Sequence, residues 1–158
     1  MTTFIDSLPK IWLSIIMKEP IIIPKEEIEP TIRQTFKEIQ ESGENFEHYF
    51  RNENNIYLFR LVGESFIREY IDYIYDWKNF WYAFRASEDF IREAPIKIWY
   101  EIAYYQKLSE PFIEEFKNEL DWDIISRRQV LSEDFCWKHK KDVNWACIRE
   151  NQEWYKWY

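Results

Sequence analysis

The chain has 158 residues, of which 32% are charged and 20% aromatic, and its formal net charge is −8. This length suits one domain with a hydrophobic core, so we expect residues 1–158 to form a single domain. The negative charge disfavours direct binding to nucleic acid and favours a partner with a basic surface. With only two glycines and few turn dipeptides, the composition argues against a β-rich fold.

The first 41 residues do not follow the pattern of the rest of the chain. Their longest apolar stretch, Ile11 to Met17, is far shorter than the ~20 residues that a membrane helix needs. With no secretion signal visible either, we expect a cytoplasmic protein without a membrane span. Pro30 predicts the start of a helix that ends at Gly43. We interpret residues 1–41 as an N-terminal cap on a repeat array, with a separate binding arm as the alternative.

From residue 63 onward, a pattern of about 23 residues repeats. Each copy begins with Ser-Glu, or with Gly-Glu in the first copy, and continues with a Phe-Ile or Phe-Cys pair. A Trp and then an Ile follow in each copy, except that the first copy has Phe80 in place of the Ile, and the later copies have a Gln two residues before their end. The clearest markers are Trp99, Trp122 and Trp145, which lie 23 residues apart. Self-similarity with a period of roughly 20–50 residues is the signature of a repeat architecture.

Each copy reads as two short helices joined by a tight turn. The opening Ser is a favourable N-cap, and apolar residues follow it at the spacing of one helical face. Asp121 and Asn144 predict the N-cap of the second helix in their copies. Helices of two to three turns are marginal alone, so the copies must stack to bury their apolar faces. The sequence therefore predicts an all-α fold, a small α-solenoid of helix-turn-helix repeats.

Four copies are expected within residues 63–154. Their boundaries are 63–86, 87–108, 109–131 and 132–154. The second copy is one residue shorter than the next, and Pro95 is expected to end its first helix early. Residues 42–62 are interpreted as a degenerate fifth copy, with a first helix around Phe46 and Phe50. Gly63 is expected to end a helix, as Gly43 does.

The pattern resembles arrays in uncharacterised proteins of giant viruses and phages, built from repeats of the form Leu-Ser-Glu-Asp-Phe-Ile, then Trp, Ile-Ser and Gln. The resemblance covers residues 63–154. It implies a helical repeat fold, a viral or phage origin and, with that origin, the host cytoplasm as location. It implies no activity, cofactor or catalytic residue.

The sequence contains no recognisable catalytic motif. It has no glycine-rich phosphate loop, no Gly-x-Ser-x-Gly elbow and no His-Glu-x-x-His. Cys136, His139 and Cys147 are one ligand short of a structural zinc site, and Cys136 replaces a core Ile of the repeat. We therefore expect core packing there, no metal, no cofactor and no enzyme activity. A carboxylate pocket formed only in the tertiary structure is the alternative.

Two residue types recur in register. The glutamines Gln106, Gln129 and Gln152 are expected to hydrogen-bond a turn or helix end of the adjacent repeat, rather than to line a polar groove. The tryptophans at positions 77, 99, 122 and 145 are expected in the core, rather than as a platform that stacks on nucleotide rings.

Positions one and five after each Trp vary between copies and point away from the predicted core. Constant cores with variable surfaces are how repeat proteins present a recognition surface, and exposed Tyr is enriched at interface hot spots. The candidate partner-binding residues are Tyr82, Tyr100, Tyr104, Tyr105, Asp123 and Arg127. The alternative for the last two is a simple ion pair along one helix.

We therefore expect a non-enzymatic protein-interaction module, most concretely a viral or phage inhibitor of a host defence protein. The alternative is a nucleotide or small-molecule sponge. In that case Trp and Tyr rings would stack on the ligand, and Lys138, Lys140 and Lys141 would bind its phosphates.

The aromatic tail, residues 155–158, follows the last repeat. Together with Trp154, the tail residues Trp157 and Tyr158 offer more apolar surface than one short helix end needs. The tail either folds back as a cap or joins two molecules about a two-fold axis, and we favour the homodimer.

Overall fold

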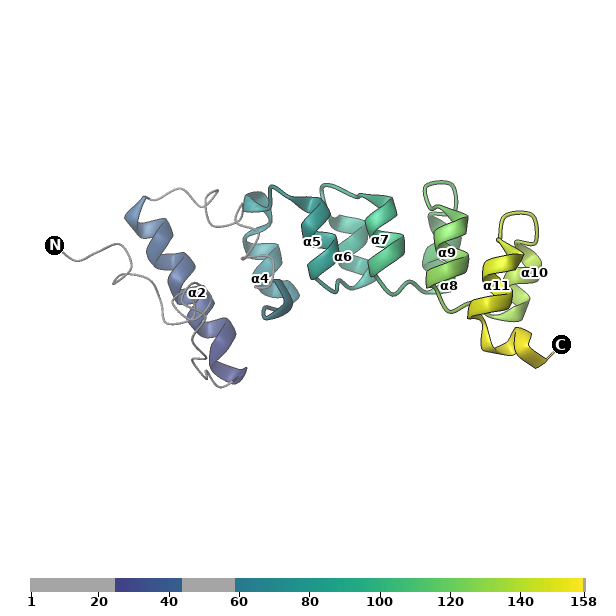
Figure 1. Cartoon of the computed structure of the whole chain (residues 1–158). Helices are drawn as coiled ribbons and strands as arrows, with labels where there is room; N and C mark the ends of the chain where they lie inside the picture. The colour runs from purple at the N-terminus through teal and green to yellow at the C-terminus, as the bar shows by residue number, and fades with distance from the viewer. Residues whose placement is uncertain (1–24, 44–58, 158) are drawn as a thin grey trace. The chain divides into compact units, whose positions relative to one another are not determined.

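The computed structural model describes residues 25–43 and 59–157, and within these ranges every regular element is a helix (Figure 1). The predicted all-α fold is confirmed. The chain divides into two compact units, residues 1–76 and 77–158. The boundary falls between the two helices of the first expected repeat, and the single domain stays a prediction.

In the first unit, α2 (Lys25–Ser42) packs against α4 (Glu64–Glu69), which the short 3-10 helix η3 (Ile71–Tyr73) follows. Phe36 of α2 is buried, and its ring centroid lies 5.2 Å from that of Phe66 and 5.1 Å from that of Tyr70. Helix α2 therefore covers α4, and the interpretation of residues 1–41 as a cap on the repeat array stays a prediction.

Two predicted helix boundaries in the first unit are wrong. The helix begins at Lys25 and carries Pro30 inside it, as its sixth residue. Gly63 does not end a helix but precedes α4, with an extended backbone (φ −86°). Gly43 does follow the end of α2 with φ +72°, which favours glycine. The expected degenerate repeat falls mostly in residues 44–58, outside the described residues.

In the second unit, short helices follow one another along the chain. They are α5 (Trp77–Ala83), α6 (Glu88–Glu93), α7 (Trp99–Tyr105), α8 (Glu110–Glu115), α9 (Trp122–Arg128), α10 (Glu133–Lys138), α11 (Trp145–Asn151) and the 3-10 helix η4 (Glu153–Trp157). The pairs α6–α7, α8–α9 and α10–α11 coincide with the last three predicted repeats. The second helices of successive repeats pack side by side, α5 on α7, α7 on α9 and α9 on α11.

The predicted N-caps are confirmed. The hydroxyl oxygen of Ser109 accepts a hydrogen bond from the amide of Phe112 (3.3 Å), and Ser87 and Ser132 do the same in their repeats. A carboxylate oxygen of Asp121 accepts from the amides of Asp123 and Ile124 in α9. Because helices this short have a large share of unpaired amides, each cap stabilises the hairpin appreciably.

The second repeat is shortened in its loop, contrary to the prediction that its first helix ends early. Helix α6 has six residues, as do α8 and α10. The connection from α6 to α7 spans residues 94–98, whereas that from α8 to α9 spans 116–121. Pro95 lies in this connection, where the missing amide proton breaks no helical bond.

The tryptophans are less uniformly buried than predicted. Trp77 is buried, whereas Trp99, Trp122 and Trp145 are half-buried. The indole N–H of Trp122 donates to the carbonyl of Lys117 (3.1 Å), in the loop between its two helices. The polar edge of the ring thus stays at the surface while its face packs against the next repeat.

The glutamines join successive repeats, as predicted. The side-chain amide of Gln129 donates to the carbonyls of Ala103 (2.8 Å) and Gln106 (2.9 Å), and its oxygen accepts from the amide of Leu108 (2.9 Å). These partners belong to the end of α7 and the turn after it. Gln106 and Gln152 make corresponding bonds to the repeats before them. Each buried glutamine therefore supplies partners to backbone groups that the preceding short helix leaves unpaired.

Replacing Gln129 by Leu should keep the side-chain volume but leave three backbone groups without partners. A buried polar group without a partner costs about 1–3 kcal/mol, so we expect unfolding free energy to fall by at least about 3 kcal/mol. Urea denaturation of the wild type and Gln129→Leu measures this. Asn118→Leu, at an exposed position of the same repeat, is the control and should change stability by less than about 0.5 kcal/mol. Equal effects of the two substitutions would contradict the role of Gln129.

Candidate interaction surface

Four of the six predicted partner-binding residues form one cluster on α5 and α7. The ring centroid of Tyr105 lies 5.0 Å from that of Tyr82 and 4.6 Å from that of Tyr104, and Tyr100 stacks 6.2 Å from Tyr104. Tyr100 is 57% exposed and Tyr82 is 41% exposed, while the other two rings are half-buried. These four residues are called the tyrosine cluster below.

Two charged groups border the tyrosine cluster without having been predicted. The guanidinium carbon of Arg128 lies 3.7 Å from the ring centroid of Tyr104, a close cation–π contact. Arg128 stands six residues after Trp122, the position that Tyr105 holds in the preceding repeat, so its register was visible in the sequence. The buried Glu101 carboxylate lies 3.9 Å from the ammonium of Lys78. Burial, together with Glu101, raises the pKa of the Tyr105 hydroxyl.

Asp123 and Arg127, the other two predicted residues, each contact the following repeat. A carboxylate oxygen of Asp123 accepts a hydrogen bond from the side-chain amide of Asn144 (2.8 Å). The guanidinium of Arg127 lies 3.8 Å from the sulfur of Cys147. Both residues remain exposed on α9, so they continue the surface beyond the tyrosine cluster.

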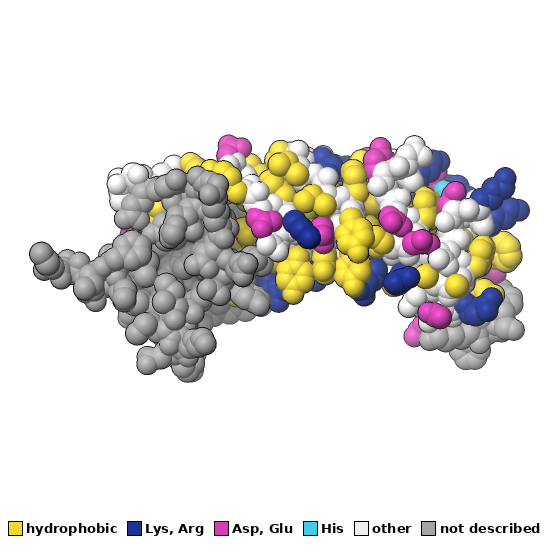
Figure 2. All heavy atoms as spheres, turned by 45° about the horizontal axis from the view of Figure 1, so that its top comes forward, with side chains coloured by type: hydrophobic (Ala, Val, Ile, Leu, Met, Phe, Trp, Pro, Cys, Tyr) yellow, Lys and Arg dark blue, Asp and Glu magenta, His cyan; other side chains and the backbone are white. Residues whose placement is uncertain are grey.

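Cations at the ends of the second helices differ in their ion pairing from the cations on the first helices. Arg85, Lys107, Arg127 and Arg128, called the basic row below, are exposed and form no ion pair within the part of the chain that the structure describes. Figure 2 shows Lys and Arg side chains beside the hydrophobic ones on the face of the repeats in view. On the first helices, by contrast, Arg92 binds Glu115 (2.8 Å) and Lys138 binds Glu114 (2.9 Å).

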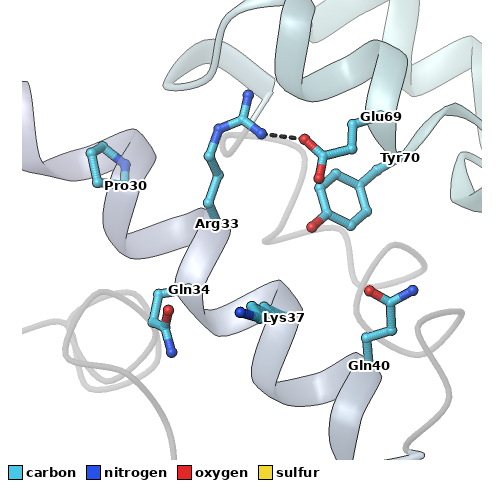
Figure 3. Close-up of a pocket in the computed structure, with 7 residues that line it drawn as sticks. All are labelled: Pro30, Arg33, Gln34, Lys37, Gln40, Glu69 and Tyr70. Atoms are coloured by element: carbon cyan, nitrogen blue, oxygen red, sulfur yellow. Dashed lines mark hydrogen bonds and ion pairs between the residues drawn. The ribbon is translucent and has the colours of Figure 1, made fainter.

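The first unit repeats this ion-pair geometry. Arg33 pairs with Glu69 of α4 (Figure 3) and lies 5.1 Å from the ring centroid of Phe66. Arg92 makes the corresponding contact in the second unit, 4.9 Å from the ring centroid of Phe112. Helix α2 thus makes the contacts of a repeat's first helix, although it is much longer.

A pocket opens beside this ion pair in the first unit (Figure 3). Its lining residues are Pro30, Arg33, Gln34, Lys37, Gln40, Glu69 and Tyr70. Glu69 already neutralises Arg33, and Lys37 lies 4.0 Å from Glu41. The lining therefore offers no converging acid and base that would indicate a reaction.

The residues weighed as metal ligands have structural contacts. Cys136 is buried in the core, as predicted, and burial raises the pKa of its thiol to about 11. His139 is buried, stacks on Trp122 with ring centroids 4.8 Å apart, and its Nε2 lies 2.7 Å from a carboxylate oxygen of Glu114. In residues 25–43 and 59–157, no group of three or more His, Cys, Asp or Glu side chains is placed to hold a metal ion.

Two residues of the alternative nucleotide site, Trp122 and Lys138, make contacts within the fold. Trp122 packs against His139, and Lys138 binds Glu114. Lys140 and Lys141 remain exposed on the following loop, where the carbonyl of Lys140 accepts a hydrogen bond from the indole N–H of Trp145 (3.0 Å).

Trp154, which directly precedes the aromatic tail, folds against its own chain. The indole N–H of Trp154 donates to the carbonyl of Leu131 (2.7 Å), and the ring is half-buried. This contact matches the cap alternative for Trp154. The side chain of Trp157 and the whole of Tyr158 lie outside the described residues.

No protein-family model, curated protein or solved structure matches this chain. None of the described helices is both long and apolar enough to cross a membrane.

The cluster around Glu114 predicts a specific response to acid. Hydrogen bonds from Lys138, Lys117 and His139 lower the pKa of Glu114 from 4.5 to about 2. A lowered pKa means that the ionised carboxylate stabilises the folded state above the unfolded pKa, and that this stabilisation is lost as pH falls from about 4.5 to about 2. Glu114→Gln should therefore be less stable than the wild type at pH 7, with a difference that shrinks towards pH 2.

Thermal unfolding followed by circular dichroism between pH 7 and pH 2 measures this difference. Glu119→Gln removes an exposed carboxylate from the same repeat and serves as the control, with little expected effect. A gap between Glu114→Gln and wild type that is constant with pH would rule out the assigned role of the ionised carboxylate.

Proposed function

We propose that the protein is a non-enzymatic interaction module that binds a partner protein through the tyrosine cluster, with Asp123 and Arg127 extending the contact. The observation that carries this proposal is the grouping of Tyr82, Tyr100, Tyr104 and Tyr105, two of them more than 40% exposed, on adjacent second helices. Tyr supplies large contact area with few rotatable bonds, which is why it is enriched at binding hot spots.

The scaffold beneath the cluster supports this reading. Gln106 ties the end of α5 to α7, and Gln129 ties the end of α7 to α9. Rings held in fixed positions lose little conformational entropy when a partner binds. A preorganised aromatic surface of this kind is suited to recognition.

The concrete form of the proposal is a viral or phage inhibitor of a host defence protein, acting in the host cytoplasm. It rests on the repeat pattern that resembles viral and phage arrays. The net charge of −8 favours a partner whose overall surface is basic.

The Tyr100→Ala, Tyr104→Ala double variant tests the binding face. Removing both rings takes away the most exposed ring and the one that Arg128 covers, so capture of the partner from host lysate should fall at least tenfold, or by about 1.4 kcal/mol. Quantitative pull-down with the immobilised protein gives the measurement. Tyr75→Ala removes a tyrosine that is 50% exposed outside the cluster and should leave capture unchanged. Retained capture by the double variant would place the binding face elsewhere.

We also propose a two-fold homodimer through the aromatic tail. Deleting residues 155–158 spares Trp154 and its bond to Leu131. Light scattering should give a dimer for the full chain and a monomer for the deletion, because the deletion removes the contact surface of Trp157 and Tyr158. A full chain that is monomeric at high micromolar concentration would contradict the dimer.

A further inference from the structure

Building on the proposed function, we infer that the segment docking on the tyrosine cluster is acidic and extended, and that its carboxylates bind the basic row. The basic row follows the carboxyl-terminal ends of α5, α7 and α9, next to the tyrosines. Arg85 comes two residues after the end of α5, Lys107 two residues after the end of α7, and Arg128 ends α9.

The contacts of these cations leave their charge unneutralised. Arg85 donates to the carbonyl of Tyr82 (3.4 Å), and Arg128 lies over Tyr104. Neither contact provides a negative charge. Of the carboxylates near the tyrosines, Glu101 lies beside the ammonium of Lys78, whereas Asp123 accepts only from the neutral amide of Asn144 and keeps its charge. An acidic segment would therefore meet cations that are available and few carboxylates that repel it.

The helix dipole alone does not account for this arrangement. Cations are favoured at helix C-termini, yet α6 ends in Glu93 and α8 ends in Glu115. Glu115 binds Arg92 of the preceding repeat. The ends of α6 and α8 thus carry carboxylates, but α10 ends in Lys138, which pairs with Glu114. The basic row is distinguished instead by its pairing, because its cations form no ion pair within the described residues, whereas Arg92 and Lys138 on the first helices do.

The repeat geometry sets the spacing of the expected carboxylates. Neighbouring packed helices lie about 8–10 Å apart, so the cations at successive helix ends recur at roughly that interval. An extended peptide advances about 3.3 Å per residue. A segment that crosses α5, α7 and α9 would therefore present a carboxylate to each helix end about every third residue. The residues between these carboxylates would contact the tyrosine rings.

Single-stranded nucleic acid is the competing anionic ligand, and the contacts disfavour it. Stacking bases need free aromatic faces, but Arg128 already covers Tyr104, and Tyr82 meets Tyr105 edge to face. The chain also carries a net charge of −8, which opposes a long phosphate backbone more than a short acidic peptide.

Selection of random 12-residue peptides displayed on phage against the full chain tests the inference. We expect enriched peptides to be acidic, with carboxylates about three residues apart. A synthetic copy of the most enriched peptide, measured by fluorescence anisotropy, should bind about tenfold more weakly to Lys107→Gln, Arg128→Gln than to the wild type. The matched control, Lys140→Gln, Lys141→Gln, removes the same charge from an exposed loop and should change affinity less than about twofold. Circular dichroism verifies that each variant is folded.

Three outcomes of the peptide experiments overturn the inference. They are the absence of any enriched peptide, enrichment of neutral or basic peptides, and acidic peptides whose affinity is equal for the two double variants. Binding of a 12-nucleotide single-stranded DNA that is lost in Lys107→Gln, Arg128→Gln would also overturn it in favour of nucleic acid. Neutral or basic peptides that still lose binding in Tyr100→Ala, Tyr104→Ala leave the proposed binding face standing. Enriched peptides insensitive to that tyrosine variant count against both proposals.

Discussion

The hydrogen bonds of one buried glutamine per repeat hold the array of the second unit together. A helix of six or seven residues leaves most of its terminal backbone groups unpaired, and several lie too deep for water to reach. Gln129 meets this constraint with a single side chain that binds two carbonyls and one amide of the preceding repeat. Each short helix is therefore stable only when the following repeat packs against it and pairs its terminal backbone groups.

These contacts between successive repeats determine which surfaces remain available to a partner. On the first helices, Glu88 and Glu110 accept from the amides of Ser109 and Ser132 in the next repeat, and Arg92 binds Glu115. These polar groups are used between repeats. The second helices instead leave outside tyrosines and cations that form no ion pair in the described part of the chain. The division between a face that joins repeats and a face that is available for recognition is what the proposed function rests on.

The same contacts recur where the repeat pattern is absent from the sequence. In the first unit, Glu29 of α2 accepts from the amide of Gly63 (2.9 Å), as Glu88 does from Ser109, and Arg33 pairs with Glu69. An 18-residue helix thus supplies the surface that α4 requires. Because only a few side chains make these contacts, a helix of different length and loop spacing satisfies them equally well.

The sequence by itself determined the helices of the second unit, their Ser, Asp and Asn caps, and the bonding role of the glutamines, because these depend on local spacing that recurs in register. It also indicated the positions of Tyr82, Tyr100 and Tyr104, since positions one and five after each Trp point outward on a helix, and Tyr105 directly follows Tyr104. Only the tertiary structure decided that Arg128 covers Tyr104, that Asp123 and Arg127 contact the following repeat, and that Gly63 begins α4. Those outcomes depend on which side chains of different repeats come within contact distance of each other. That distance is set by how the helices stack and not by spacing along the chain.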